Sequence, residues 1–234
     1  MTLGTISPSW QHAFFKVLGV FVSIVASLAW LTTIVTLFSL WAEDDFVRYE
    51  SDDGEVVYIS NVGARHKSVF IVGTAITGIL FVLTLIFTKL CFDKENRRRF
   101  KRSISMASII FGILSGISLS LLAILDSVNY KIAHYTFTGL FIAFTLLSAI
   151  FSIVYRFSRN EVNVAVNIRV VFVSMVTPLV ITFVVMSLIK RSDNQTQLKS
   201  VAASIEWSIA IFFVSYLAVF ALDLLLSINH DLNI

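Results

Sequence analysis

Long uncharged stretches alternate with short charged segments along this chain. Residues 68–88 and 103–125 contain no ionisable side chain. As a helix, each stretch is long enough to cross a hydrocarbon core of about 30 Å, which takes roughly 20 apolar residues. The same pattern predicts spans at about 17–41, 68–90, 103–125, 132–155, 170–189 and 203–226. Because lipid offers no partner to backbone N–H and C=O groups, we expect an all-α polytopic membrane protein, with six transmembrane helices in one bundle and a single domain over residues 1–234.

Composition agrees with a membrane protein and argues against other classes. Hydrophobic residues make up 57% of the 234 positions and charged residues 14%, whereas a soluble domain carries about 25% charged residues. The net charge of +3 arises mainly from one loop, while a nucleic-acid-binding protein presents a broad basic face. Cys91 is the single cysteine, which excludes an internal disulfide. We therefore expect membrane lipids and no nucleic acid as partners, with a membrane protein as a further candidate.

The loops differ in charge, and this difference predicts the orientation of the chain. Residues 89–102 carry seven Lys or Arg against two acids, and residues 42–67 carry seven acids against three cations. Five cations of the first loop form a basic run that we expect to contact anionic lipid: Arg97, Arg98, Arg99, Lys101 and Arg102. Basic loops lie on the cytosolic side of a membrane. Both termini are therefore predicted to be cytosolic, and the acidic loop 42–67 to be luminal or extracellular.

Polar residues at the span ends are the candidates for chemistry. Asp126 ends the third span, His134 opens the fourth, and Glu206 opens the sixth, just before Trp207. We expect all of them on the luminal side, either as ordinary wetted residues or as one shared polar pocket. If the protein is an enzyme, His134 with Glu206 or Asp126 forms the acid–base pair, although a lone histidine at a helix end more often makes a structural hydrogen bond. Asp223 lies seventeen residues beyond Glu206 and therefore belongs to the cytosolic end.

Standard enzyme motifs are absent from the sequence. It contains no nucleophile elbow, no HExxH, no phosphate loop and no dinucleotide fingerprint. No two of its four histidines have the spacing of metal ligands. We therefore expect no cofactor and no metal.

The sequence also contains small residues at helical spacing and two candidate modification sites. Gly112 and Gly116 share one helical face, as do Thr74 and Gly78, and such spacing lets helices pack closely inside a bundle. Cys91, at the cytosolic edge of the second span, is a candidate for palmitoylation. Asn194 opens the single glycosylation sequon, in a loop predicted to be luminal.

Three segments together resemble the six-span Frag/DRAM/Sfk family, whose fold is also the Cwh-type N-terminal domain. The first is the luminal signature Tyr58-Ile59-Ser60-Asn61-Val62-Gly63-Ala64, similar to the family's tyrosine–isoleucine–serine–aspartate–x–glycine motif. The second runs from Asp126 to Phe144 with His134 at the head of the fourth span, and the third is Ala203 to Trp207, followed by Phe213, Tyr216 and Asp223. Asn61 replaces the family's aspartate, and Arg65-His66-Lys67 replaces its usual proline–glutamate.

The resemblance implies lipid handling or lipid-dependent regulation, since family members promote autophagy, influence phospholipid asymmetry or remodel the lipid of GPI anchors. Our leading hypothesis is a non-enzymatic integral membrane protein that modulates membrane lipid organisation or autophagy. The alternatives are a GPI-anchor lipid-remodelling enzyme or subunit, and a small transporter, which the lack of charges inside the spans disfavours. The compartment stays open among lysosome, Golgi or endoplasmic reticulum, and plasma membrane.

Overall fold

The computed structural model describes residues 8–51, 53–92, 99–188 and 195–232, and these residues form helices joined by loops. The helices are α1 (Pro8–Glu43), α2 (Ile59–Arg65), α3 (Lys67–Phe92), α4 (Arg99–Ile124), α5 (Lys131–Ser158), α6 (Val164–Leu188) and α7 (Gln195–Leu232). All except α2 are long and apolar enough to cross a membrane. The predicted all-α fold with six spans is confirmed. Three helices begin clearly earlier than the predicted spans: α1 at Pro8, α6 at Val164 and α7 at Gln195.

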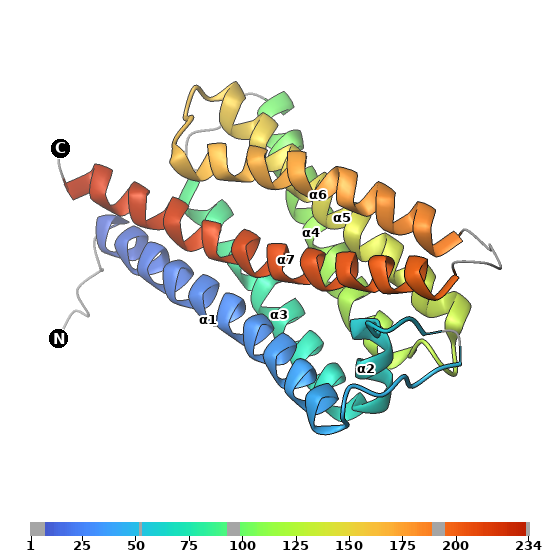
Figure 1. Ribbon diagram of the computed structural model, residues 1–234. Helices are drawn as coiled ribbons and strands as arrows, with labels where there is room; N and C mark the ends of the chain where they lie inside the picture. Colours follow the sequence, from blue (N-terminus) through green and yellow to red (C-terminus); the bar gives the residue numbers. More distant parts are fainter. Residues whose placement is uncertain (1–7, 52, 93–98, 189–194, 233–234) are drawn as a thin grey trace, which may run out of the picture.

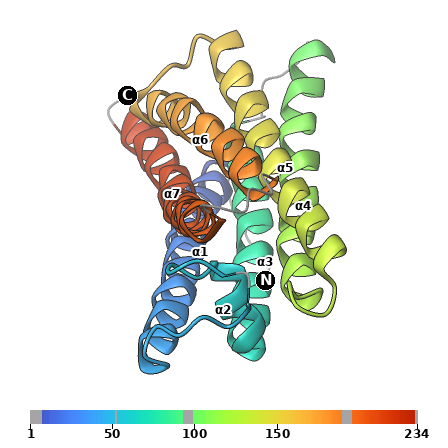
Figure 2. The same ribbon diagram turned by 45° about the vertical axis from the view of Figure 1, so that its right-hand side comes forward.

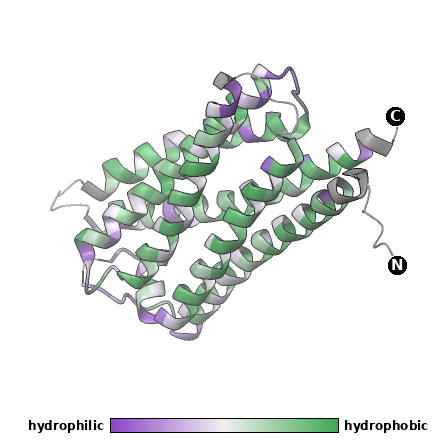
Figure 3. Ribbon diagram, turned by 180° about the vertical axis from the view of Figure 1, so that it is seen from behind, coloured by the Kyte–Doolittle hydropathy of each residue, from purple (hydrophilic) through white to green (hydrophobic). Residues whose placement is uncertain are grey.

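The long helices form a closed bundle, shown from two sides in Figures 1 and 2. Helix α1 packs against α3 and α7, α3 against α4, α4 against α5, and α6 against both α5 and α7. The helix surfaces are apolar along most of their length, and polar residues gather toward the two ends (Figure 3). This distribution fits a bundle whose middle faces hydrocarbon and whose ends face water.

The two ends of the bundle are chemically different. One end, called here the acidic-loop end, carries residues 42–51 and 53–58, α2 and the connection from α4 to α5 (Figure 1). The opposite end, called here the basic-loop end, carries the start of α1, the ends of α3 and α7, and the connection from α5 to α6. There the Lys16 Nζ donates a hydrogen bond of 3.2 Å to the carbonyl of Ser227, which joins the first and last long helices.

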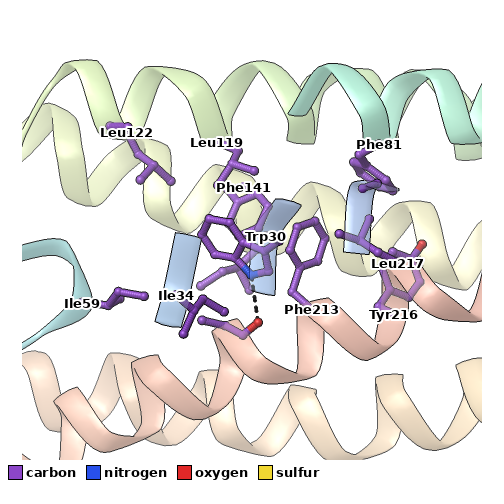
Figure 4. Packing of buried hydrophobic residues seen from close by; sticks show 14 of the residues in the cluster. Trp30, Ile34, Ile59, Phe81, Leu119, Leu122, Phe141, Phe213, Tyr216 and Leu217 are labelled. Carbon is purple, nitrogen blue, oxygen red and sulfur yellow. Dashed lines mark hydrogen bonds between the residues drawn. The ribbon is translucent and has the colours of Figure 1, made fainter. Parts of the chain in front are cut away.

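Aromatic side chains fill the centre of the bundle (Figure 4). Phe213 of α7 makes edge-to-face contacts with Trp30, Phe81 and Phe141, at centroid distances of 6.0, 5.7 and 5.1 Å. The Trp30 indole N–H donates to the Ala210 carbonyl at 2.9 Å, so this buried donor is satisfied. The core therefore ties α1, α3, α5 and α7 together at mid-height.

Glycines allow a close approach between α3 and α4. A Cβ atom added to Gly78 would lie 2.9 Å from the Gly116 carbonyl oxygen, and one added to Gly116 would lie 3.1 Å from the Gly78 carbonyl oxygen. Helix backbones this close leave no room for side chains. The spacing of small residues thus serves packing within the bundle, as the sequence predicts.

Candidate functional site

The signature segment folds as the short helix α2 rather than as a plain loop. Ile59, Ser60, Val62 and Gly63 are buried against the bundle. A Cβ at Gly63 would collide with the Phe70 ring of α3, so only glycine fits there. This contact explains why the segment contains a glycine at that position.

Asn61 is the link between the acidic loop, α2 and the connection after α4. Its Nδ2 donates to Asp53 Oδ1 at 2.7 Å, and its Oδ1 accepts from the Ser127 hydroxyl at 2.7 Å. Asp53 is itself buried, and its Oδ2 accepts the backbone N–H groups of Tyr49 and Glu50 at 3.1 and 2.8 Å. An amide supplies both a donor and an acceptor, which a carboxylate cannot do.

Next to this link, the buried Asp126 forms an ion pair with the more exposed Lys67. Its Oδ2 lies 2.6 Å from the Lys67 Nζ at the start of α3, and its Oδ1 accepts the backbone N–H of Asn129 at 2.7 Å. Burial alone would raise the pKa of Asp126, but the hydrogen bonds from Asn129 and Lys67 outweigh it and hold this pKa well below the usual aspartate range. Asp126 is therefore a charged anchor and lacks the accessible proton of a general acid.

His134 is buried and bonded to the end of α4. Its Nδ1 lies 2.7 Å from the Leu122 carbonyl oxygen and 3.1 Å from that of Leu125. The last carbonyls of a helix have no partner within the helix, so His134 donates to groups that need a donor. Its side chain, 1% exposed, thus stabilises the turn between α4 and α5.

Glu206 and Trp207 connect α7 to the signature. The Trp207 indole N–H donates to the Val57 carbonyl at 2.9 Å. The Glu206 carboxylate faces the first turn of α2, toward the N–H groups of Ile59 and Ser60 and the Ser60 hydroxyl. The start of a helix favours negative charge. Its Oε2 atom is buried and has no hydrogen-bond partner among the described residues.

The candidate residues thus share one end of the bundle, as predicted, but divide among separate contacts. Asp126 binds Lys67, His134 binds the end of α4, and Glu206 faces α2. The neighbour of Glu206 is the signature segment rather than His134. These contacts do not bring Asp126, His134 and Glu206 into one shared pocket.

An open polar groove of about 610 Å³ lies between the acidic loop and α2. Its lining mixes acids, arginines and amides: Asp44, Asp45, Val47, Arg48, Tyr49, Glu50, Asn61, Ala64, Arg65, Val128 and Asn129. On its rim, the Tyr49 hydroxyl donates to Asp44 at 2.7 Å and lowers the pKa of that carboxyl. Within the described part of the chain, no three His, Cys, Asp or Glu side chains are placed to hold a metal ion.

A charged cluster at the basic-loop end goes beyond what the sequence predicts. Asp223 of α7 pairs with Arg156 of α5 at 2.9 Å and with Arg169 of α6 at 3.0 Å. The predicted fifth span begins after Arg169, and that boundary is wrong, because α6 buries Arg169 inside the bundle. Charged residues are therefore present inside the spans. The sequence-based argument against a transporter, which relied on the absence of such charges, is wrong. An aspartate in an apolar stretch, with arginines at matching depth on other helices, is the signal that could have found this cluster.

The remaining predicted sites lie at the basic-loop end or outside the described residues. Cys91 is half-buried near the end of α3. Lys101 donates to the Ser158 carbonyl at 2.6 Å, and Arg102 is exposed near the start of α4. Arg97, Arg98 and Asn194 lie outside the described residues, and the side chain of Arg99 does too.

This architecture defines a polytopic six-helix membrane protein with a structured polar cap at one end. Residues 18–226 match the family described as the Frag1/DRAM/Sfk1/Cwh43P N-terminal domain, and the chain belongs to this family. It is 24% identical over 213 residues to Protein sfk1 of Schizosaccharomyces pombe, an alignment that covers 89% of this chain. The alignment spans 64% of that relative's length. No solved structure matches the chain.

Proposed function

We propose that this protein is a non-enzymatic integral membrane protein that modulates the lipid organisation of its membrane. The main observation in favour of this proposal is that polar residues at the acidic-loop end bind other groups of the protein. Asp126 and His134 bind groups of the protein itself at 2.6 and 2.7 Å, and so act as structural anchors. Family membership, together with the likeness to Protein sfk1 over most of the chain, supports the same role.

The test compares cells with and without the protein. The measured quantities are the fractions of phosphatidylserine and phosphatidylethanolamine in the outer leaflet, autophagic flux, and the lipid composition of GPI-anchored proteins. We expect a changed leaflet distribution that the wild-type chain restores, with GPI-anchor lipids unaltered. An unchanged leaflet distribution with altered GPI-anchor lipids would contradict the proposal. A change in autophagic flux alone would favour the autophagy branch of the family.

A second candidate function rests on Glu206. Its Oε2 atom is buried without a hydrogen-bond partner among the described residues. A carboxylate held in this way is suited to take up a proton from a substrate. This feature supports a role in GPI-anchor lipid remodelling, and it is tested by Glu206→Gln, because the amide keeps the shape of the side chain but cannot act as a base.

The basic run before and at the start of α4 supports contact with anionic lipid. Lysine and arginine next to a membrane contribute about 1 kcal/mol each toward an anionic surface. Replacing the five cations of the run by Gln should weaken association with vesicles containing phosphoinositide, and the loss should be greatest at low salt. If a correctly oriented mutant associates with these vesicles as strongly as the wild type does, the basic run serves only to set the topology.

A further inference from the structure

A partly open cavity lies between α3, α4, α5, α6 and α7 at the basic-loop end of the bundle. Its volume is about 40 Å³, which is room for a few water molecules or a group of similar size. Residues of all five helices line it, among them Lys89, Ser105, Arg156, Arg169 and Asp223. It is on the opposite end from the signature helix and belongs to none of the contacts described for that end.

Positive charge exceeds negative charge in the lining of this cavity. Leaving aside Lys89 at the end of α3, the charged lining residues are Arg156 and Arg169 against Asp223 alone. Glu161, just outside, binds Arg156 at 2.9 Å but is shared with Arg159 at 2.8 Å. Including Glu161 and Arg159 adds one charge of each sign, so the excess of positive charge is unchanged. Burying unbalanced charge is costly unless an opposite charge compensates it.

Arginine donors in the cluster are left without partners. The Arg169 side chain is 1% exposed, and it reaches Asp223 through Nη1, at 3.0 Å. Its Nε and Nη2 atoms have no hydrogen-bond partner among the described residues, and neither does Arg156 Nε. The guanidinium rests on the Phe220 ring, 4.5 Å from the ring centroid, which holds its plane in place. Asp223 Oδ2 also lacks a hydrogen-bond partner among the described residues, but the three unpaired arginine nitrogens outnumber this one oxygen. An unsatisfied buried donor is costly, so such a surplus of donors indicates an absent acceptor.

We propose that this cavity binds a phosphate group, with Arg169 and Arg156 as its main ligands. The parallel N–H groups of a guanidinium match the oxygens of a phosphate, and the charge excess matches its negative charge. Arg169 lies five residues into α6, roughly 7.5 Å along the helix from its first residue. A lipid headgroup and free phosphate offer the same chemistry at this depth. The inference goes beyond the proposed function, since binding is measured on purified protein whatever the cellular phenotype.

Two variants and a control test the site in the full chain, purified in neutral detergent. Arg169→Lys keeps the charge opposite Asp223 but removes the guanidinium fork. Ser105→Leu fills the cavity and leaves both arginines in place; Ser105 is 7% exposed. Arg48→Lys makes the same chemical change at an exposed position of the acidic loop. High salt screens exposed cations much more than buried ones, so binding is measured at 0.5 M salt, on the order of a 4–5 Å screening length.

The probes are inorganic phosphate, short-chain phosphatidic acid and the matching diacylglycerol, which lacks the phosphate. Wild type and Arg48→Lys should bind a phosphate-bearing probe and ignore diacylglycerol, while Arg169→Lys and Ser105→Leu bind it roughly tenfold more weakly. Binding of inorganic phosphate as well identifies a free-anion site, and binding of phosphatidic acid alone identifies a lipid site. Absence of phosphate-specific binding by the wild type overturns the proposal. Equal binding by folded Arg169→Lys or Ser105→Leu overturns it too.

Discussion

The Asn61 amide donates a hydrogen bond of 2.7 Å to the Asp53 carboxylate, and this bond attaches the acidic loop to α2. The same amide accepts from Ser127, so one side chain joins three segments of the chain. An aspartate at this position would place a second carboxylate against Asp53. Asparagine therefore belongs to a local arrangement of polar partners.

Replacing Asn61 by Asp should destabilise the acidic-loop end. The change removes the donor to Asp53 and sets like charges in contact, which costs about 1–3 kcal/mol at neutral pH. Protonating one of the two carboxylates removes the repulsion between them, so the loss should be largest at neutral pH and shrink on acidification. Thermal unfolding in detergent at pH 7 and pH 4.5 measures this. Asn160→Asp, the same change on an exposed turn, is the control and should have little effect at either pH.

The Lys67–Asp126 pair should make stability depend on acid pH. The folded pKa of Asp126 is lowered, so its contribution is present above the ordinary aspartate pKa near 4 and is lost as the pH falls toward the folded value. Lys67→Met removes the partner and should cost about 1–3 kcal/mol at pH 7, because a buried carboxylate loses a hydrogen bond. Lys67→Met with Asp126→Asn should cost less than the sum of the single changes. Additive losses would show that the two side chains do not interact.

Close packing of α3 on α4 predicts a large difference between two glycine substitutions. Gly78→Ala places a methyl group 2.9 Å from the Gly116 carbonyl oxygen and should destabilise the bundle by about 1–3 kcal/mol. Gly139→Ala is the matched control, because a Cβ there meets nothing within 4 Å. Alanine favours a helix over glycine by about 1 kcal/mol, so the control should be neutral or stabilising. Similar unfolding temperatures for the two variants would rule out the close approach.

Topology is predicted from loop charge and is testable with terminal tags. Tags at both ends should be digested by protease added to the cytosolic side of sealed vesicles. A tag inserted in the acidic loop at Glu50 should be protected until detergent is added. Protection of either terminal tag would reverse the orientation, and digestion at only one terminus would contradict the shared end formed by Lys16 and Ser227.

The sequence predicts those features that depend on composition and helical spacing. Uncharged length sets the six spans, and the spacing of Gly112 and Gly116 indicates close helix packing. It does not predict that the signature forms α2, because seven residues carry too little periodicity. The partners of His134 also depend on where α4 ends, a boundary that hydropathy places only within a few residues. The burial of Arg169 escapes prediction for the same reason, since an early start of α6 turns a loop residue into a buried one.

The exchange of Glu206 for glutamine, in cells that lack the endogenous protein, separates a structural role of this carboxylate from a catalytic one. In a non-enzymatic protein the amide keeps the shape that faces α2, so Glu206→Gln should be folded and should restore the normal leaflet distribution of phosphatidylserine. Glu206→Ala should restore it less well and should unfold at a lower temperature, because the contact with α2 is lost. GPI-anchor lipids should be the same in all of these cells. If Glu206→Gln has wild-type stability yet fails to restore the leaflet distribution, and GPI-anchor lipids change with it, the protein acts by acid–base catalysis and is not a non-enzymatic modulator of lipid organisation.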